Sequence, residues 1–274
     1  MAAAYPARFV ALGDSITVGL GDGVTMGRER RHDAPARGFA ARLVEWLGPP
    51  GAVEYTNLAT TGATARAVRT RQLPVALTLA PQVATVVAGM NDVLKPSFDP
   101  LRLRQDLVWT VGRLRAQGAT VVTATMPDPG RLLRLPGPLA GLLADRVEQL
   151  NAAVHATART DPGVLVVDLA RHPAVRRRST FDVDRVHPGP YGHQLIAQAF
   201  AHRLAEAGVP PVSTPAWVGH PAPPESEVAA PGTLRHGYWL LSVGVPWLAG
   251  RCLPKGDPGP SGAENWPRSL PRRA

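Results

Sequence analysis

The sequence predicts an α/β protein, a three-layer α/β/α sandwich built on a doubly wound parallel sheet of five strands. From residue 8 to about residue 207, short Val-rich apolar runs alternate with helix-length amphipathic stretches, which is the pattern of βαβ units. Each apolar run ends near Gly, Asn, Asp or Pro, the residues that punctuate strands. Because crossovers between parallel strands are right-handed, few alternatives remain to helices on both faces.

The elements follow from these patterns in chain order. Strands are expected where the apolar runs are short and rich in Val, at residues 9–12, 53–57, 83–88, 120–125 and 164–168. Helices are expected where apolar residues recur at three- and four-residue spacings, at residues 38–47, 64–72, 100–117, 139–160 and 191–207. Two tryptophans in these helices, Trp46 and Trp109, are expected to be packing residues.

Composition bounds the class of protein. The 45% hydrophobic and 19% charged content is that of a soluble globular chain. The net charge of +9 comes from scattered arginines with no nucleic-acid-binding motif, so no nucleic-acid partner is expected. A lone Cys252 excludes an intrachain disulfide and a thiolate metal cluster. The first fifteen residues have neither a charged region nor an apolar run of the secretory kind, so we expect a cytoplasmic protein.

The composition changes after Gly208, which divides the chain into three expected parts. Residues 1–208 form the α/β domain, and residues 209–232 form a Pro-rich linker. Residues 233–274 hold an apolar and aromatic segment followed by a basic Pro/Gly-rich tail. The apolar part, residues 234–253, is too short to span a membrane and is interrupted by Pro246. It is expected either to pack on its own domain or to contact a membrane surface or partner.

A serine follows the first predicted strand, in Gly13-Asp14-Ser15-Ile16-Thr17-Val18-Gly19. Open parallel sheets bind ligands at the carboxyl ends of their strands. Ser15 is therefore a candidate nucleophile, although a serine in an isolated Gly-Asp-Ser tripeptide also serves as a turn cap.

A serine nucleophile needs a base, and the base needs an acid that fixes its tautomer. His187 and Asp184, in Asp184-Arg185-Val186-His187-Pro188, follow the fifth predicted strand and precede the last helix. A carboxylate three residues before a histidine can reach back to its Nδ1 atom. Asp168 with His172 is a rival pair, and Asp182 is a rival acid.

Acyl transfer also needs donors for the developing oxyanion. The second predicted strand leads into Asn57-Leu58-Ala59-Thr60-Thr61-Gly62-Ala63-Thr64, where Gly62 offers an unobstructed amide. The third leads into Gly89-Met90-Asn91-Asp92, where Asn91 offers its side chain. Taken singly, Gly62 is equally a turn residue and Asn91 a helix cap. Asp14 and Asp92 are expected to hold these turns in place.

These four blocks, GDSITVG, NLATTGAT, GMND and DRVHP, resemble in kind and order the signature blocks of the SGNH hydrolases, a branch of the GDSL esterases and lipases. The resemblance covers residues 8–205 and implies a flavodoxin-like sheet. It implies a serine esterase without metal or cofactor that acts on a small-molecule ester. The resemblance assigns Ser15, Asp184 and His187 to the catalytic triad, and Ser15, Gly62 and Asn91 to the oxyanion hole.

The same triad also serves acyltransferases and thioesterases, which remain alternatives, because water access to the acyl-enzyme decides between hydrolysis and transfer. A non-enzymatic alternative is a membrane- or partner-binding protein that acts through its C-terminal tail.

Overall fold

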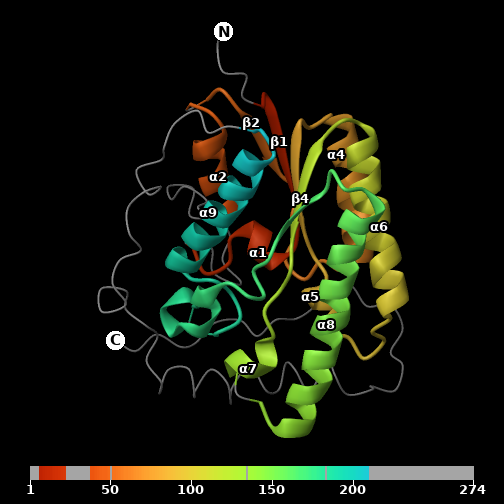
Figure 1. Cartoon of the computed structure of the whole chain (residues 1–274), viewed down its shortest axis with the longest axis vertical. Coiled ribbons are helices and arrows are strands. Elements are labelled where there is room, and N and C mark those ends of the chain that lie inside the picture. Colours follow the sequence, from red (N-terminus) through yellow and green to blue (C-terminus); the bar gives the residue numbers. More distant parts are fainter. Residues whose placement is uncertain (1–5, 23–37, 50, 134, 183, 210–274) are drawn as a thin grey trace, which may run out of the picture.

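The computed structural model describes residues 6–22, 38–49, 51–133, 135–182 and 184–209. Within these residues the chain forms one parallel sheet of five strands in the order β2-β1-β3-β4-β5, which confirms the predicted class (Figure 1). The predicted C-terminal segment and nearly all of the predicted linker lie outside the described residues. The strands are β1 (Arg8–Gly13), β2 (Glu54–Asn57), β3 (Val83–Val87), β4 (Thr120–Ala124) and β5 (Leu165–Val167).

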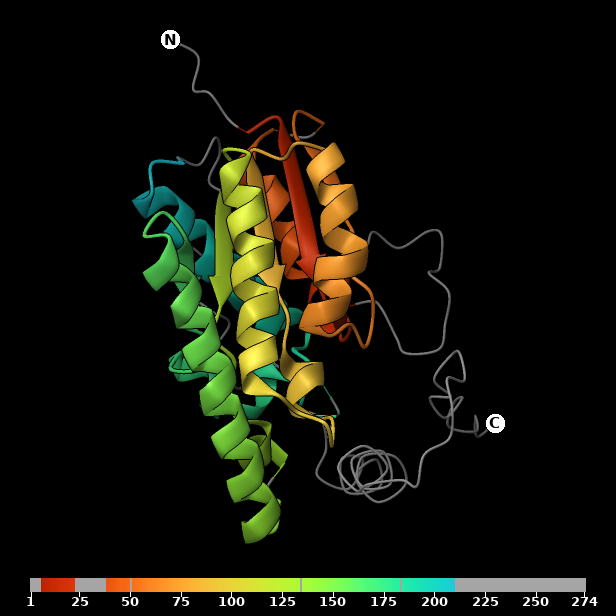
Figure 2. The same cartoon turned by 90° about the vertical axis from the view of Figure 1, so that its right-hand side faces the viewer.

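Helices cover both faces of the sheet, as Figures 1 and 2 show. Helices α2 (Phe39–Leu47) and α9 (Pro190–Glu206) lie together on one face. Helices α4 (Leu73–Thr78), α6 (Pro100–Ala116) and α8 (Gly137–Thr160) cover the other face. Three layers result, so the central strands are buried between two helical layers, whereas the edge strand β2 is partly exposed.

Burial of apolar surface explains this layering. All five residues of β3 are buried, as expected for a central strand covered on both faces. The centres of the Phe39 and Phe200 rings lie 5.0 Å apart, so these two rings pack α2 against α9. Each large apolar side chain buried in this way contributes about 2 kcal/mol from its removal from water.

The second predicted helix is longer than its pattern indicated. Helix α3 (Ala65–Ala67) passes through the π-helical turn η1 (Val68–Gln72) directly into α4, so the helix ends at Thr78 instead of Gln72. Pro74 has no N–H to donate and would ordinarily end a helix. Here the Leu73 N–H instead bonds the Val68 carbonyl five residues back, and the wider turn carries the chain past the proline.

The expectation for Trp109 was wrong. Its side chain on α6 is 53% exposed, with the Arg69 guanidinium 5.0 Å from the ring centre. Trp46 is buried on α2, as expected. The apolar spacing of α6 places Trp109 at the margin of the packed face, where a cation–π contact covers part of the ring.

Short helical turns lie at the carboxyl edge of the sheet (Figure 1). Two candidate site residues, Ser15 and Asn91, lie in such turns, and Gly62, Asp184 and His187 lie in loops. In the described part of the chain, no helix is both long enough and apolar enough to cross a bilayer. The turns are α1 (Ser15–Val18), α5 (Met90–Val93), α7 (Pro129–Leu133), and the 3₁₀ turns η2 (Pro173–Arg176) and η3 (Arg178–Thr180).

Candidate active site

Ser15 begins α1 immediately beyond the end of β1. The Asp14 side chain caps this turn by accepting a hydrogen bond from the Ile16 N–H at 3.1 Å. Gly13 precedes the turn, and a β-carbon there would collide with the Val87 carbonyl oxygen and the Thr17 hydroxyl. Only glycine fits where β1 comes this close to β3. The strand ends at this glycine, so Ser15 lies at the edge of the sheet.

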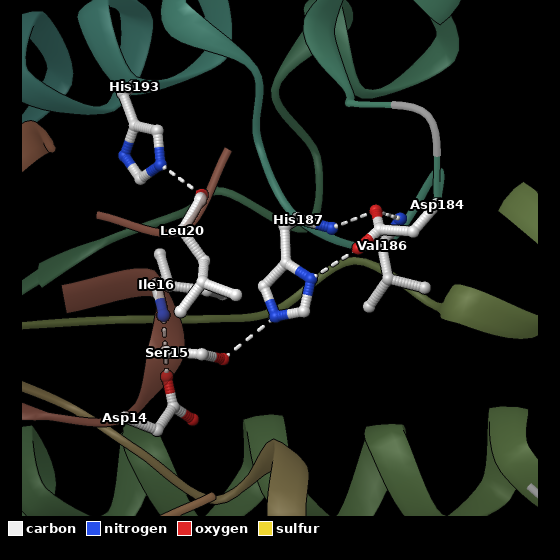
Figure 3. A network of polar contacts seen from close by, with 8 residues as sticks. All are labelled: Asp14, Ser15, Ile16, Leu20, Asp184, Val186, His187 and His193. Carbon is white, nitrogen blue, oxygen red and sulfur yellow. Dashed lines mark hydrogen bonds and ion pairs between the residues drawn. The ribbon is translucent and has the colours of Figure 1, made fainter. Parts of the chain in front are cut away.

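His187 and Asp184 reach Ser15 from the loop between β5 and α9 (Figure 3). The His187 Nε2 atom lies 2.8 Å from the Ser15 Oγ atom, and its Nδ1 atom lies 2.6 Å from an Asp184 carboxylate oxygen. The other Asp184 oxygen accepts from the Val186 and His187 amides at 2.8 and 2.9 Å. The carboxylate therefore fixes both its own loop and the imidazole, as the three-residue spacing predicted.

The electrostatics of this loop favour a basic imidazole. Burial lowers the pKa of His187, but the charge and hydrogen bond of Asp184 outweigh burial and raise that pKa above its ordinary 6.5. Burial raises the pKa of Asp184, but the charge and hydrogen bond of His187 and the two amides hold that pKa below 3.8. The carboxylate thus stays charged and stabilises the proton that His187 accepts.

The two predicted oxyanion donors lie beside the serine turn. Gly62 follows β2 in a turn closed by the Ala63 N–H on the Thr60 carbonyl, and its φ of 81° favours glycine. The Asn91 side chain begins α5 after β3 and is buried. Its Nδ2 atom lies 3.2 Å from the Ala63 carbonyl and 3.4 Å from the Asp14 carboxylate. Asn91 therefore bridges the Gly62 turn and the serine turn.

Two carboxylates, the buried Asp14 and the half-buried Asp92, support these turns. Asp92 accepts from the Ala65 N–H at 2.9 Å and so holds the start of α3 beside the Gly62 turn. Burial raises the pKa of Asp14 and that of Asp92 to about 6, despite the backbone hydrogen bonds that each accepts. The contacts of both side chains fit the structural role expected from the sequence.

Gln72 is a residue of this site that sequence reasoning missed. The π turn presents its buried amide to the end of β1. Its Oε1 atom accepts from the Gly13 N–H at 2.8 Å, and its Nε2 atom donates to the Gly13 carbonyl at 2.9 Å and to the Thr60 hydroxyl at 3.4 Å. One signal was available: a glutamine two residues before Pro74 interrupts an apolar face, at the place where a π turn is required.

The rival residues occupy other positions. Asp168 accepts from the Thr125 hydroxyl at 2.8 Å, and His172 caps η2 by accepting from the Ala174 N–H at 3.3 Å. Asp182 lies near His187, where its charge raises the pKa of the imidazole, but it bonds the His187 carbonyl through its backbone N–H. Among the described residues, no group of three or more His, Cys, Asp or Glu side chains is placed to hold a metal ion.

Comparison with known families identifies a match to most of this domain. The GDSL-like Lipase/Acylhydrolase family matches residues 11–195, a range that includes all the candidate site residues named above. A GDSL-like esterase of Mycobacterium tuberculosis is 31% identical over 165 residues. That alignment takes in 57% of this chain and 50% of the esterase, so the chain spans about half the length of the relative it matches.

Solved structures share the fold. TesA superposes with a TM-score of 0.56 at 20% identity, over 73% of this chain and 99% of TesA. A psychrotrophic esterase of Pseudoalteromonas, solved with monoethylphosphonate as inhibitor, gives 0.55 at 14% identity, over 73% and 97%. An acetylxylan esterase of Geobacillus stearothermophilus gives 0.53 at 20% identity, over 72% and 93%. At these identities the likeness concerns the fold.

Proposed function

This chain belongs to the GDSL-like Lipase/Acylhydrolase family, a family of ester-hydrolysing enzymes, and from that premise we propose that it is a serine esterase that cleaves carboxylic esters through an acyl-enzyme. The observation that carries the proposal is the unbroken chain of two short contacts, 2.8 Å from Ser15 to His187 and 2.6 Å from His187 to Asp184. In serine hydrolases of unrelated folds, the nucleophile likewise contacts the base, and the base contacts the orienting acid.

Acylation begins when the Ser15 oxygen attacks the ester carbonyl carbon and gives its proton to His187 Nε2. The carbonyl electron pair moves onto oxygen, and the Asp184 carboxylate stabilises the imidazolium that forms. When the tetrahedral intermediate collapses, the bond to the alcohol oxygen breaks and His187 returns the proton to the departing alcohol. A water molecule, deprotonated by His187, then releases the acid and restores Ser15.

The developing oxyanion would accept from the Ser15 and Gly62 amides and from the Asn91 side chain. The Asn91 amide has two N–H bonds, and the one toward Asp14 spans 3.4 Å, the long limit of a hydrogen bond. This weakly held N–H is available to the substrate oxygen, while the bond to Ala63 keeps the side chain in place. Removing one such donor in a serine hydrolase costs about 100- to 1000-fold in kcat.

The test uses p-nitrophenyl esters of increasing acyl length together with a fluorophosphonate label. The wild-type protein should hydrolyse short esters and be labelled once per chain, and Ser15→Ala should lose both properties while melting at the same temperature. The exposed Ser97→Ala is the matched control and should behave as wild type. A wild type that is neither active nor labelled contradicts the function, and an active Ser15→Ala contradicts the site.

A further inference from the structure

A hollow lies beside the proposed active site, at the same edge of the sheet. It has a volume of about 820 Å³ and is bordered by α7, α8 and the 3₁₀ turns η2 and η3. In Figure 1, α7 and the first part of α8 lie at the lower end of the molecule, and the teal-green turns η2 and η3 lie above α7 on the left. The volume lies within the range of cavities that hold small organic ligands. None of Ser15, Gly62, Asn91 and His187 lines it, so it is distinct from the triad and its oxyanion donors.

Arginine is concentrated in its wall. Seven of the 23 lining residues are arginine, a share about three times that in the whole chain, where all but two of the 30 basic residues are arginine. The wall holds four acidic residues, so its formal charge is +3. Two of the four acids already pair with cavity arginines, Asp128 with Arg131 at 3.5 Å and Asp168 with Arg171 at 3.8 Å. The remaining arginines are Arg159, the run 176–178 and Arg185.

Most of the other lining residues are apolar, with Thr125, Asn151 and His155 as the polar exceptions. Met126, Leu132, Val147 and Phe181 contribute apolar surface. Asn151 holds the end of β4 in place, because its side chain accepts from the Met126 N–H at 2.7 Å and donates to the Met126 carbonyl at 2.9 Å. A cavity that combines apolar wall residues, an anchored strand end and several guanidinium groups suits an organic anion better than a bare ion.

The cavity and the triad share the loop of residues 184–188. Arg185 lines the cavity, yet it directly follows Asp184 in this loop and is itself buried. Its φ of 57° lies in the left-handed region that a residue with a side chain seldom adopts. Phe181 also lines the cavity, and its backbone pairs with that of Pro188, next to His187. A ligand in the cavity would therefore contact the segment that positions the base.

We propose that this cavity binds the carboxylate or phosphate group of a small organic molecule whose apolar part packs on Met126 and Phe181. Guanidinium groups bind both anions through paired hydrogen bonds. The anion has two chemical sources, the ester substrate itself or a separate ligand that acts on the loop of residues 184–188. The assignment of the substrate as the source rests on the proposed function, whereas binding of the anion does not.

Binding is measured first, on Ser15→Ala protein, so that no turnover is needed. Phenyl phosphate and 4-hydroxybenzoate are titrated by calorimetry, with methyl 4-hydroxybenzoate as the neutral counterpart. Arg176→Gln/Arg177→Gln removes two exposed cavity charges, and Arg102→Gln/Arg104→Gln removes two exposed charges from α6 as the matched control. We expect both anions to bind, the cavity variant to raise Kd at least about fivefold, and the control to stay within twofold.

Turnover then identifies the source. With wild-type protein, kcat/KM for 4-acetoxybenzoate relative to its methyl ester should fall in the cavity variant and not in the control if the substrate carries the anion. If the anion is a separate ligand, that ratio is unchanged while added phenyl phosphate alters kcat for the neutral ester. The cavity site is overturned if neither anion binds the Ser15→Ala protein, or if the two double variants raise Kd by the same factor. Binding without any ester hydrolysis would leave the site standing and contradict the proposed function instead.

Discussion

The Gln72 side chain and the Gly13 peptide groups form a closed pair of hydrogen bonds, with Gly13 N–H to Gln72 Oε1 at 2.8 Å and Gln72 Nε2 to the Gly13 carbonyl at 2.9 Å. The pair stands at the end of β1, two residues before Ser15. The Gln72 side chain thus bonds both peptide groups of the last residue of β1, just before the serine turn begins. The first prediction concerns this relationship.

Gln72→Met keeps the size of the side chain but leaves the buried Gly13 N–H without the Gln72 acceptor, and leaves the Gly13 carbonyl with only the Thr60 N–H at 3.2 Å. We expect a loss of about 1–3 kcal/mol in the free energy of unfolding. We also expect kcat to fall at least about tenfold with KM little changed, because the serine turn loses its support. Urea unfolding and steady-state kinetics measure the two effects. The exposed Gln105→Met serves as control and should change neither.

Gln72→Glu separates positioning from simple stability. A protonated glutamic acid can accept from the Gly13 N–H and donate to its carbonyl, whereas the carboxylate can only accept. The activity of Gln72→Glu relative to wild type at the same pH should therefore rise as the pH falls. A ratio that is constant across pH would contradict the positioning role.

A second prediction concerns the pH dependence of catalysis. The neutral His187 imidazole is the base, so kcat/KM should rise with pH through a pKa above 6.5, since Asp184 raises that pKa. In Asp184→Asn the raising charge is gone and burial lowers the pKa, so the rise should move to lower pH while the maximal rate falls about 10⁴-fold. Rate profiles from pH 5 to 9 test both. An unshifted profile in Asp184→Asn would show that another group, such as Asp182, sets the pKa.

Asp92 should destabilise the fold at neutral pH. Its pKa is about 6 in the folded protein against an ordinary 3.8, so folding favours the protonated form, and stability falls as pH rises from about 4 to above 6. Asp92→Asn keeps an acceptor for the Ala65 N–H without the buried charge. We expect it to stabilise the protein by up to about 3 kcal/mol at pH 7.5 and by little at pH 4. An equal difference at the two pH values, measured by urea unfolding, would refute this account.

His193 should give the opposite pH dependence. Its ring is fully buried, and its Nδ1 atom accepts from the Phe39 N–H at 3.1 Å. Its Nε2 atom donates to the Leu20 carbonyl at 2.8 Å (Figure 3). Burial lowers its pKa to about 4 from 6.5, so its stabilising effect is full above pH 6.5 and is lost as pH falls toward 4.

His193→Gln tests this assignment, because glutamine can make the same two hydrogen bonds and does not titrate. The variant should lose less stability than wild type between pH 6.5 and 4, by up to about 3 kcal/mol. Unfolding curves at several pH values give the comparison, with the exposed His202→Gln as control. If the free energy of unfolding falls equally between pH 6.5 and 4 in wild type and His193→Gln, His193 is not the titrating group.

Much of the fold was predictable because its signals are local. The Val-rich strands and the residues that end them are adjacent in sequence, so all five strands were found within about two residues. The contacts among Ser15, His187 and Asp184 were anticipated because strand ends meet at one sheet edge and because a three-residue spacing fits a carboxylate to the Nδ1 atom of histidine.

The missed features depend on contacts distant in sequence. Gln72 meets Gly13 across 59 positions, and a π turn decides which way its side chain points. The surroundings of Trp109 include Arg69, which is 40 positions away in sequence and covers part of the ring. Periodicity identifies the apolar face of a helix but does not fix its edges. The arginine cavity likewise gathers residues from three separate stretches of chain, each unremarkable by itself.

The imidazole of His193 binds the Leu20 carbonyl and the Phe39 amide at once, so one side chain clamps together two points of the backbone that are 19 positions apart in sequence. An ion pair between Asp22 and Arg42, at 2.9 Å, joins the same two stretches of chain. The segment between these anchors starts two residues after α1, close to the proposed nucleophile. For protein engineering, the clamp marks two fixed points of the backbone, and sequence exchanged between them should leave the geometry of Ser15 unchanged.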